Sequence, residues 1–181
     1  MAITGIFGLP GQGKTYEGCR LLLKAANGGR QCYSVTPINH PNVMTIEYDD
    51  VVDPWLPPGL IFLDEVHLVL SYTVWSKLDP KWFEKLSQTR KDGHDLIYTS
   101  QHHSKVLKQL RDNTNYGFQT TAWGPSDVSR PLGFSAAGYH MHNFQKGKPR
   151  ERYFHFFRSS VARAYQTSFA IQAAAAERPS D

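Results

Sequence analysis

The sequence predicts an α/β fold in which helices flank a central parallel sheet, and three stretches carry this prediction. An apolar run at residues 3–7 leads into a glycine-rich loop, and a helical pattern follows over residues 14–26. Two more short apolar runs, within residues 60–65 and 95–101, each end in polar side chains. Strands that are apolar on both sides belong inside a parallel sheet covered by helices, so their polar ends are expected to meet at one edge.

The glycine-rich loop, residues 8–15 (GLPGQGKT), fits G-x-x-x-x-G-K-[ST] at every fixed position. Its glycines allow backbone amides to approach phosphate oxygens, while Lys14 adds a positive charge and the Thr15 hydroxyl can ligate magnesium. The expected ligand is therefore Mg²⁺-bound ATP or another nucleoside triphosphate on a P-loop. The residues expected to bind it are Gly8, Pro10, Gly11, Gln12, Gly13, Lys14, Thr15 and Tyr16.

Two acids, Asp64 and Glu65, end the apolar run at residues 60–63. At the carboxyl edge of a parallel sheet they open toward the same side as the phosphate loop. We expect Asp64 to hold magnesium together with Thr15, and Glu65 to act as the general base that polarises a water for attack on the γ-phosphate. A fixed glutamate base argues for hydrolysis over phosphotransfer.

Gln101 ends the strand expected at residues 95–101. If this strand lies between the phosphate-loop strand and the Asp64 strand, Gln101 reaches the γ-phosphate or its attacking water. The alternative is an ordinary polar residue at a strand end. His67 fits a hydrogen-bonded side chain better than a catalytic one. His102, His103, His140 and His142 fit exposed or core side chains better than a metal site.

The remaining elements follow from hydrophobic periodicity and turn residues. In chain order they are strands at 31–35 and 43–48, a proline-rich loop at 49–59, a short helical piece at 66–70, a helix from Pro80 to about Lys91, a helix capped by Ser104 that ends near Arg111, and a strand at 116–123.

The C-terminal part predicts a β-hairpin extension, with strands at 139–145 and 152–157 around a basic tip, and then a helix at 162–177. We expect residues 1–125 to form the ATPase core and residues 126–181 to pack on the same domain. Basic residues between 144 and 163 alternate with aromatic ones: Phe144, Tyr153, Phe154, Phe156 and Phe157. This composition suits single-stranded nucleic acid. A solvated turn with its aromatic side chains in the core fits equally well.

Length and composition limit the number of domains and the class of protein that the chain can be. At 181 residues and 40% hydrophobic side chains, the chain fits one domain with a sizeable core. A net charge of +4 does not by itself indicate a nucleic-acid partner. Cys19 and Cys32 fit reduced core thiols of a cytoplasmic protein. The sequence shows neither a signal peptide nor a run of about 18 apolar residues, so any membrane segment is expected outside this chain.

With these pieces placed, the chain resembles the zonula occludens toxin family, which includes the gene I assembly proteins of filamentous phages. The resemblance rests on residues 8–15, residues 60–65, the QTRKDG segment that leads to Gln101, and the aromatic segment at 153–168. It implies a RecA-like (ASCE) ATPase related to hexameric DNA pumps, at the cytoplasmic face of the bacterial inner membrane. The implied role is hydrolysis of ATP to drive export of phage single-stranded DNA and virion assembly.

The resemblance also implies partners. These would be further copies of the chain in a ring such as a hexamer, phage single-stranded DNA or its packaging complex, and phage coat and pore proteins. In ring ATPases a neighbouring subunit inserts an arginine against the γ-phosphate, and Arg111 and Arg90 are the candidates. Two other functions stay open: a nucleotide-dependent interaction or toxin-like protein, and a small-molecule kinase, which would require a lid rich in arginine.

Overall fold

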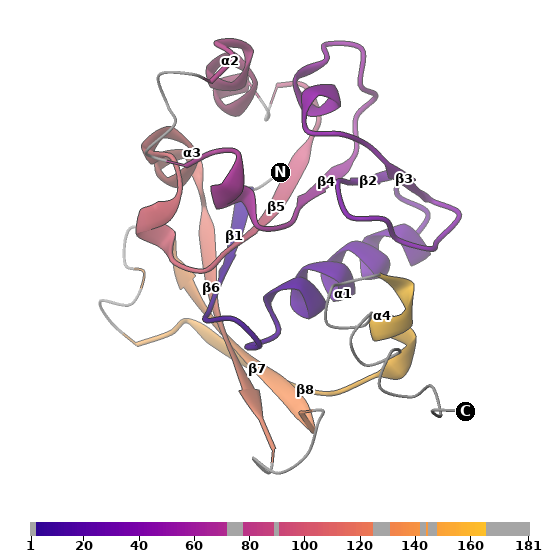
Figure 1. The fold of residues 1–181 in the computed structure, drawn as a ribbon, viewed down its shortest axis with the longest axis vertical. Coiled ribbons are helices and arrows are strands. Elements are labelled where there is room, and N and C mark those ends of the chain that lie inside the picture. The colour runs from indigo at the N-terminus through magenta and orange to yellow at the C-terminus, as the bar shows by residue number, and fades with distance from the viewer. Residues whose placement is uncertain are drawn as a thin grey trace, which may run out of the picture.

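One eight-stranded sheet organises the chain in the computed structural model, which describes residues 3–71, 78–88, 91–124, 131–141, 144 and 148–165 (Figure 1). The strands are β1 (Ile3–Phe7), β2 (Cys32–Ser34), β3 (Val43–Thr45), β4 (Leu60–Leu63), β5 (Asp95–Ser100), β6 (Tyr116–Trp123), β7 (Gly133–His140) and β8 (Glu151–Phe156). The helices are α1 (Lys14–Asn27), α2 (Lys81–Gln88), α3 (Lys108–Asn113) and α4 (Ser159–Ala164), with short 3-10 turns η1 (Asp49–Val52), η2 (Val66–Leu68) and η4 (His103–Lys105).

The strand order is β3-β2-β4-β5-β1-β6-β7-β8. Pairings from β3 to β6 are parallel, whereas β6-β7 and β7-β8 are antiparallel. This confirms the predicted α/β fold with a parallel central sheet and a C-terminal hairpin. Because β5 lies between β4 and β1, the carboxyl ends of the three strands that carry the expected site residues are adjacent.

The sheet has a separate apolar core on each face. On one face Cys19 and Leu22 of α1 pack against Ile6 and Phe62. On the other face Phe7 of β1 and the alternate residues Leu96 and Tyr98 of β5 pack with side chains of α2 and α3. Both cysteines are buried and free, at positions that fit core thiols. Among the residues that the structure describes, no helix is long and apolar enough to cross a bilayer.

The helix expected to begin at Ser104 was placed wrongly. The His102 side chain accepts a bond from the Ser104 amide and caps a single 3-10 turn, η4. Val106 is then extended and pairs with Ser71, so α3 begins only at Lys108. A tertiary bridge therefore interrupts what the sequence presents as one helical pattern.

The C-terminal elements also begin earlier than expected. The first hairpin strand, β7, covers 133–140 where we expected 139–145, because its small residues have low strand propensity and are held by an eight-residue register with β6. The last helix begins at Ser159 where we expected residue 162. It does not continue through Tyr165, which is extended and bridges to Ile38. Residues 145–147 of the expected tip and 166–177 of the expected helix lie outside the described residues.

Candidate functional site

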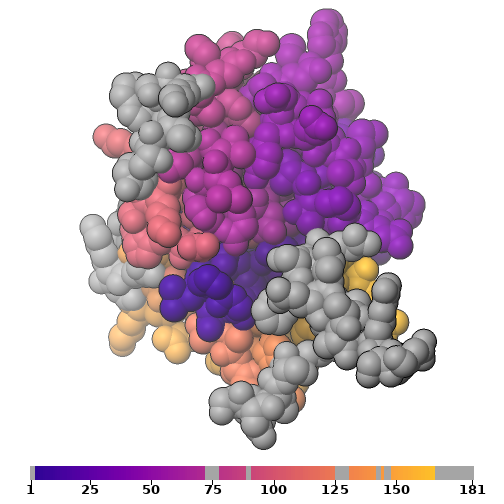
Figure 2. Space-filling view, viewed as in Figure 1, coloured from indigo at the N-terminus to yellow at the C-terminus, as the bar shows by residue number. Residues whose placement is uncertain are grey.

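The glycine-rich loop joins β1 to α1 and reaches the molecular surface, where it forms part of the indigo region in Figure 2. The Gln12 amide bonds to Leu9 O at 3.1 Å, which closes the loop. Gly13 has a φ of 81°, a left-handed value that favours glycine, and it directly precedes α1 without a capping side chain. The first amides of a helix have no intrahelical partner, so this end of α1 is suited to bind an anion.

Lys14 is the first residue of α1, and its side chain lies back over the loop. Only 5% of it is exposed. Its Nζ donates to Leu9 O at 3.3 Å and lies 3.6 Å from Glu65 Oε1. The structure thus brings the expected phosphate-binding cation and the expected base to the same place.

Thr15 and Asp64 meet across the gap between α1 and β4. The Thr15 hydroxyl lies 3.0 Å from one carboxylate oxygen of Asp64 and 3.1 Å from the other. Burial is the main cause that raises the pKa of Asp64, while hydrogen bonds from Thr99 and Thr15 act in the opposite direction. Because burial disfavours the charged form of this carboxylate, a nearby cation would stabilise that form strongly.

Thr99 is a site residue that sequence reasoning missed. Its hydroxyl donates to Asp64 Oδ1 at 2.6 Å and accepts from the Glu65 amide at 2.7 Å, so it fixes both acids. Tyr48 was missed as well, and its hydroxyl donates to the Asp64 carbonyl at 2.6 Å. The sequence signal for Thr99 was weak, because only the β4-β5 pairing brings this side chain to Asp64.

Glu65 adopts a left-handed conformation, with φ 50° and ψ 42°, which is unique among the non-glycine residues that the structure describes. Such a backbone costs an L-residue about 1–2 kcal/mol and persists when surrounding contacts enforce it. Here the Thr99 bond and the turn η2 enforce it. The Glu65 side chain is 32% exposed, and its Oε2 lies 3.3 Å from His67 Nδ1.

The residues present fit a magnesium ion bound with phosphate. Mg²⁺ prefers oxygen ligands and is usually held by one or two carboxylates together with substrate phosphates. The Thr15 hydroxyl and the Asp64 carboxylate supply such oxygens beside the open end of α1. Within the described ranges, no group of three or more His, Cys, Asp or Glu side chains could hold a metal by itself.

The other expected site residues differ in position. Gln101 follows β5 at the same sheet edge as the acids, and its Oε1 accepts from Lys105 Nζ at 3.3 Å. Arg111 lies on α3, and its charge acts on Tyr98. Arg90, the second arginine candidate, lies outside the described residues.

Tyr16 and Gln12 support the loop from behind. The Tyr16 side chain is buried and donates to Phe156 O at 3.4 Å, so only its backbone amide is left to face a phosphate. The Gln12 side chain accepts from the Ala122 amide at 2.8 Å. Gly8 and Pro10 complete the loop at its β1 side and its exposed tip.

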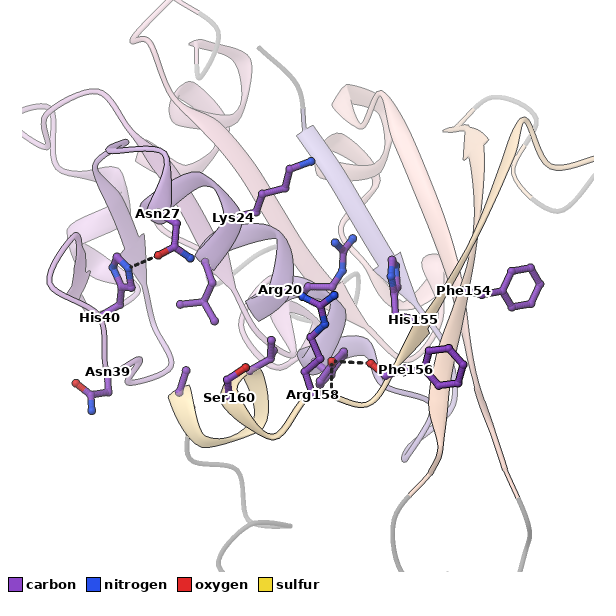
Figure 3. Close-up of a pocket in the computed structure, with 14 residues that line it drawn as sticks. Arg20, Lys24, Asn27, Asn39, His40, Phe154, His155, Phe156, Arg158 and Ser160 are labelled. Carbon is purple, nitrogen blue, oxygen red and sulfur yellow. Dashed lines mark hydrogen bonds between the residues drawn. The ribbon is translucent and has the colours of Figure 1, made fainter.

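A hollow of about 670 Å³ lies away from the phosphate loop, between α1, β8 and α4 (Figure 3). Its polar lining includes Arg20, Lys24 and Arg158. Arg20 is held by the buried Glu17 through two bonds of 2.7 and 2.8 Å. Within the described part of the chain, Lys24 and Arg158 form no ion pair, so the hollow carries positive charge.

Comparisons with known proteins agree with this geometry. Residues 34–123 match the family model described as zonular occludens toxin (Zot). A comparison with curated proteins finds no match. Among solved structures, the N-terminal domain of zonular occludens toxin from Neisseria meningitidis superposes with a TM-score of 0.63 at 14% identity, covering 91% of this chain and 98% of that one.

Two further structures share the fold. The genome packaging NTPase B204 of Sulfolobus turreted icosahedral virus 2, in complex with ATP-gammaS, has a TM-score of 0.56 at 11% identity, covering 85% of this chain and 96% of that one. The flagellar accessory protein FlaH of Methanocaldococcus jannaschii has a TM-score of 0.56 at 9% identity, covering 87% and 85%. These matches confirm the predicted P-loop NTPase fold. The family-model match over residues 34–123 and the shared fold thus agree with the resemblance to the zonular occludens toxin family that the sequence motifs indicate.

Proposed function

We propose that this domain binds ATP with Mg²⁺ and hydrolyses it to ADP and phosphate. The observation that carries the proposal is the convergence of Lys14, Thr15, Asp64 and Glu65 at the uncapped end of α1. The structures of the packaging NTPase B204 in complex with ATP-gammaS, AMPPCP and AMP support a nucleotide as the ligand.

The proposed roles follow from chemistry and position. The amides of the loop and of the first turn of α1 bind the phosphates, and Lys14 Nζ adds its charge to the outer ones. Thr15 and Asp64 would hold Mg²⁺, which neutralises charge that develops on the phosphates. Glu65 orients and deprotonates the attacking water.

Two polar residues near Glu65 complete the proposed site. His67 lies beside the Glu65 carboxylate and restricts its orientation. Gln101 follows β5, the strand between β4 and β1, at the sheet edge where we expect the γ-phosphate. We assign Gln101 the role of reporting whether that phosphate is present.

The test separates binding from hydrolysis. Glu65→Gln should bind a fluorescent ATP analogue as tightly as the parent and lose at least about 100-fold in steady-state hydrolysis, the lower range of a general base. Lys14→Ala should lose binding itself. Glu47→Gln, which changes an exposed acid outside the site, is the matched control. Equal hydrolysis by Glu65→Gln and Glu47→Gln would remove Glu65 as the base, and phosphate transfer to a metabolite would favour a kinase.

We further propose that hydrolysis drives export of filamentous-phage single-stranded DNA at the bacterial inner membrane, with several copies of the chain acting as a ring. The match of residues 34–123 to the zonular occludens toxin family model supports this role, and so does a fold shared with a genome packaging NTPase. Coat and pore proteins would be the partners on the assembly path. In this role Arg111 is the candidate to act on a neighbouring subunit's nucleotide.

Two experiments test this finer role. In the phage-producing host, Glu65→Gln should stop virion release while intracellular phage DNA continues to accumulate, and unchanged release would contradict an export motor. Mixing Arg111→Ala with Glu65→Gln protein should restore part of the hydrolysis that each lacks, because one mixed interface keeps both groups. No restoration, with mixed oligomers present by light scattering, would exclude Arg111 as the group acting in trans.

A further inference from the structure

The antiparallel strands β6, β7 and β8 carry a sheet face that is rich in exposed aromatic side chains. The pairing Gly133↔Phe156 and Ser135↔Phe154, with Trp123↔Gly133 on the other side, places Trp123, Phe154 and Phe156 on one face. This is the face opposite to α1: Phe134 and Tyr153, from alternate positions, contact Tyr16 and Phe118 on the α1 side. We call the set of Trp123, Arg152, Phe154 and Phe156 the aromatic face.

The rings of Trp123, Phe154 and Phe156 belong to neither of the two apolar cores of the sheet. Phe154 is 71% exposed and Phe156 is 74% exposed. Figure 3 shows both rings pointing away from α1, whereas His155, between them on β8, points toward Arg20. The Trp123 ring lies over Gly133, where an added Cβ would come within 2.6 Å of it, and forms an edge contact with Phe156 at 5.4 Å between centroids. Large rings left in water on a sheet mark a binding surface.

The charge around the aromatic face is positive. Arg152 is two residues before Phe154 on the same side of β8, is exposed, and has no carboxylate partner within the described ranges. Lys148 and Arg150 precede the strand. The acid of β8, Glu151, is on the α1 side and accepts from the Tyr153 hydroxyl. A second copy bringing the same face would therefore meet like charge, which disfavours self-pairing.

We propose that the aromatic face binds single-stranded nucleic acid, with bases stacked on Phe154 and Phe156 and the backbone phosphates drawn to Arg152 and its basic neighbours. A ligand for this face must be negatively charged and must offer flat rings, and unpaired nucleotides combine both. Aromatic side chains on a sheet surface stack bases in the same way in RNA-recognition domains. The choice of DNA over RNA rests on the export role proposed above, whereas the binding itself does not depend on ATP hydrolysis.

The test uses a fluorescein-labelled (dT)30 oligonucleotide and fluorescence anisotropy with the whole chain. Phe154→Ala and Phe156→Ala should each weaken binding roughly five- to 150-fold, the effect of losing one stacked base. Trp55→Ala is the matched control, because Trp55 is 87% exposed on the loop before β4. Phe154→Trp should keep binding and Phe154→Leu should lose it, since stacking needs a flat ring. Arg152→Gln should lower the slope of log K against log salt by about 0.7.

Three readouts decide the proposal. Weaker (dT)30 binding by the alanine variants, with unchanged mass by light scattering and the same rate of ATP hydrolysis as the parent, supports it. This result also supports nucleic-acid binding if the parent itself does not hydrolyse ATP. Unchanged (dT)30 binding by both alanine variants overturns it. A loss of oligomers in the Phe154→Ala protein, with binding by the remaining species unaltered, also overturns it and makes the face a subunit contact.

Discussion

Thr99→Val offers a direct test of how the two acids are held. Thr99 is fully buried in β5. Valine has nearly the same shape as threonine, so the substitution removes only the hydroxyl. That hydroxyl donates to Asp64 at 2.6 Å and accepts from the Glu65 amide at 2.7 Å. A hydrogen bond to a charged group contributes about 1.5–3 kcal/mol, and a buried amide left unpaired costs about 1–3 kcal/mol. We expect the free energy of unfolding to fall by about 3 kcal/mol.

Thr120→Val is the matched control for this change. Thr120 is also a buried threonine of the sheet, on β6, but its hydroxyl donates to the neutral Phe7 carbonyl at 3.2 Å. Its loss should cost about 1 kcal/mol. Urea unfolding followed by circular dichroism gives both values. In addition, Thr99→Val should slow ATP hydrolysis, because the Glu65 amide loses its anchor, whereas Thr120→Val should leave it near the parental rate.

Two outcomes would refute this reasoning. If Thr99→Val and Thr120→Val unfold at the same urea concentration, the Asp64 carboxylate does not depend on Thr99. If Thr99→Val is destabilised but hydrolyses ATP at the parental rate, the bond to the Glu65 amide does not position the base.

The remaining predictions concern backbone strain and pH. Gly13→Ala should cost clearly more stability than Gly11→Ala by urea unfolding, because both glycines have positive φ but only at Gly13 would the new Cβ meet the Phe134 ring, at 2.2 Å; equal losses would contradict this. Glu65→Gly should be about 1 kcal/mol more stable than Glu65→Ala, since glycine accepts the left-handed backbone, and both should lose hydrolysis. Burial lowers the pKa of His94, so this residue's contribution to stability is present above about pH 6.5 and should be lost as pH falls through the lowered folded value; His94→Gln should show a flatter pH profile of the urea midpoint.

The sequence could predict the parts of the site that are local in the chain. The glycine-rich loop, its lysine and threonine, and the acids after β4 lie in short motifs whose spacing already encodes a strand, a turn and a helix. The prediction that β5 separates β4 from β1 was conditional, and the strand order confirmed it. Gln101 therefore lies at the expected sheet edge, while its role and those of the other site residues stay predictions.

The parts that could not be predicted depend on contacts between distant segments. Thr99 faces Asp64 only through the β4-β5 register, and Tyr48 reaches the Asp64 carbonyl from a loop. The left-handed backbone of Glu65 has no sequence signal, because glutamate normally avoids it. Strand β7 is rich in small residues, so its pairing with β6 outweighs its weak propensity.

The contacts between the phosphate loop and the C-terminal strands indicate that β7 and β8 belong to the fold that shapes the site. Phe134 packs where a Cβ of Gly13 would be, and its ring centroid is 4.7 Å from that of Tyr16. The Tyr16 hydroxyl donates to Phe156 O and accepts from the Arg158 amide at 3.0 Å. A chain cut after residue 125 would expose Tyr16 and leave the first turn of α1 without this support. We therefore expect the 1–125 fragment to lack a cooperative thermal transition. A fragment that melts cooperatively and binds ATP as the whole chain does would show that the loop needs only the parallel strands.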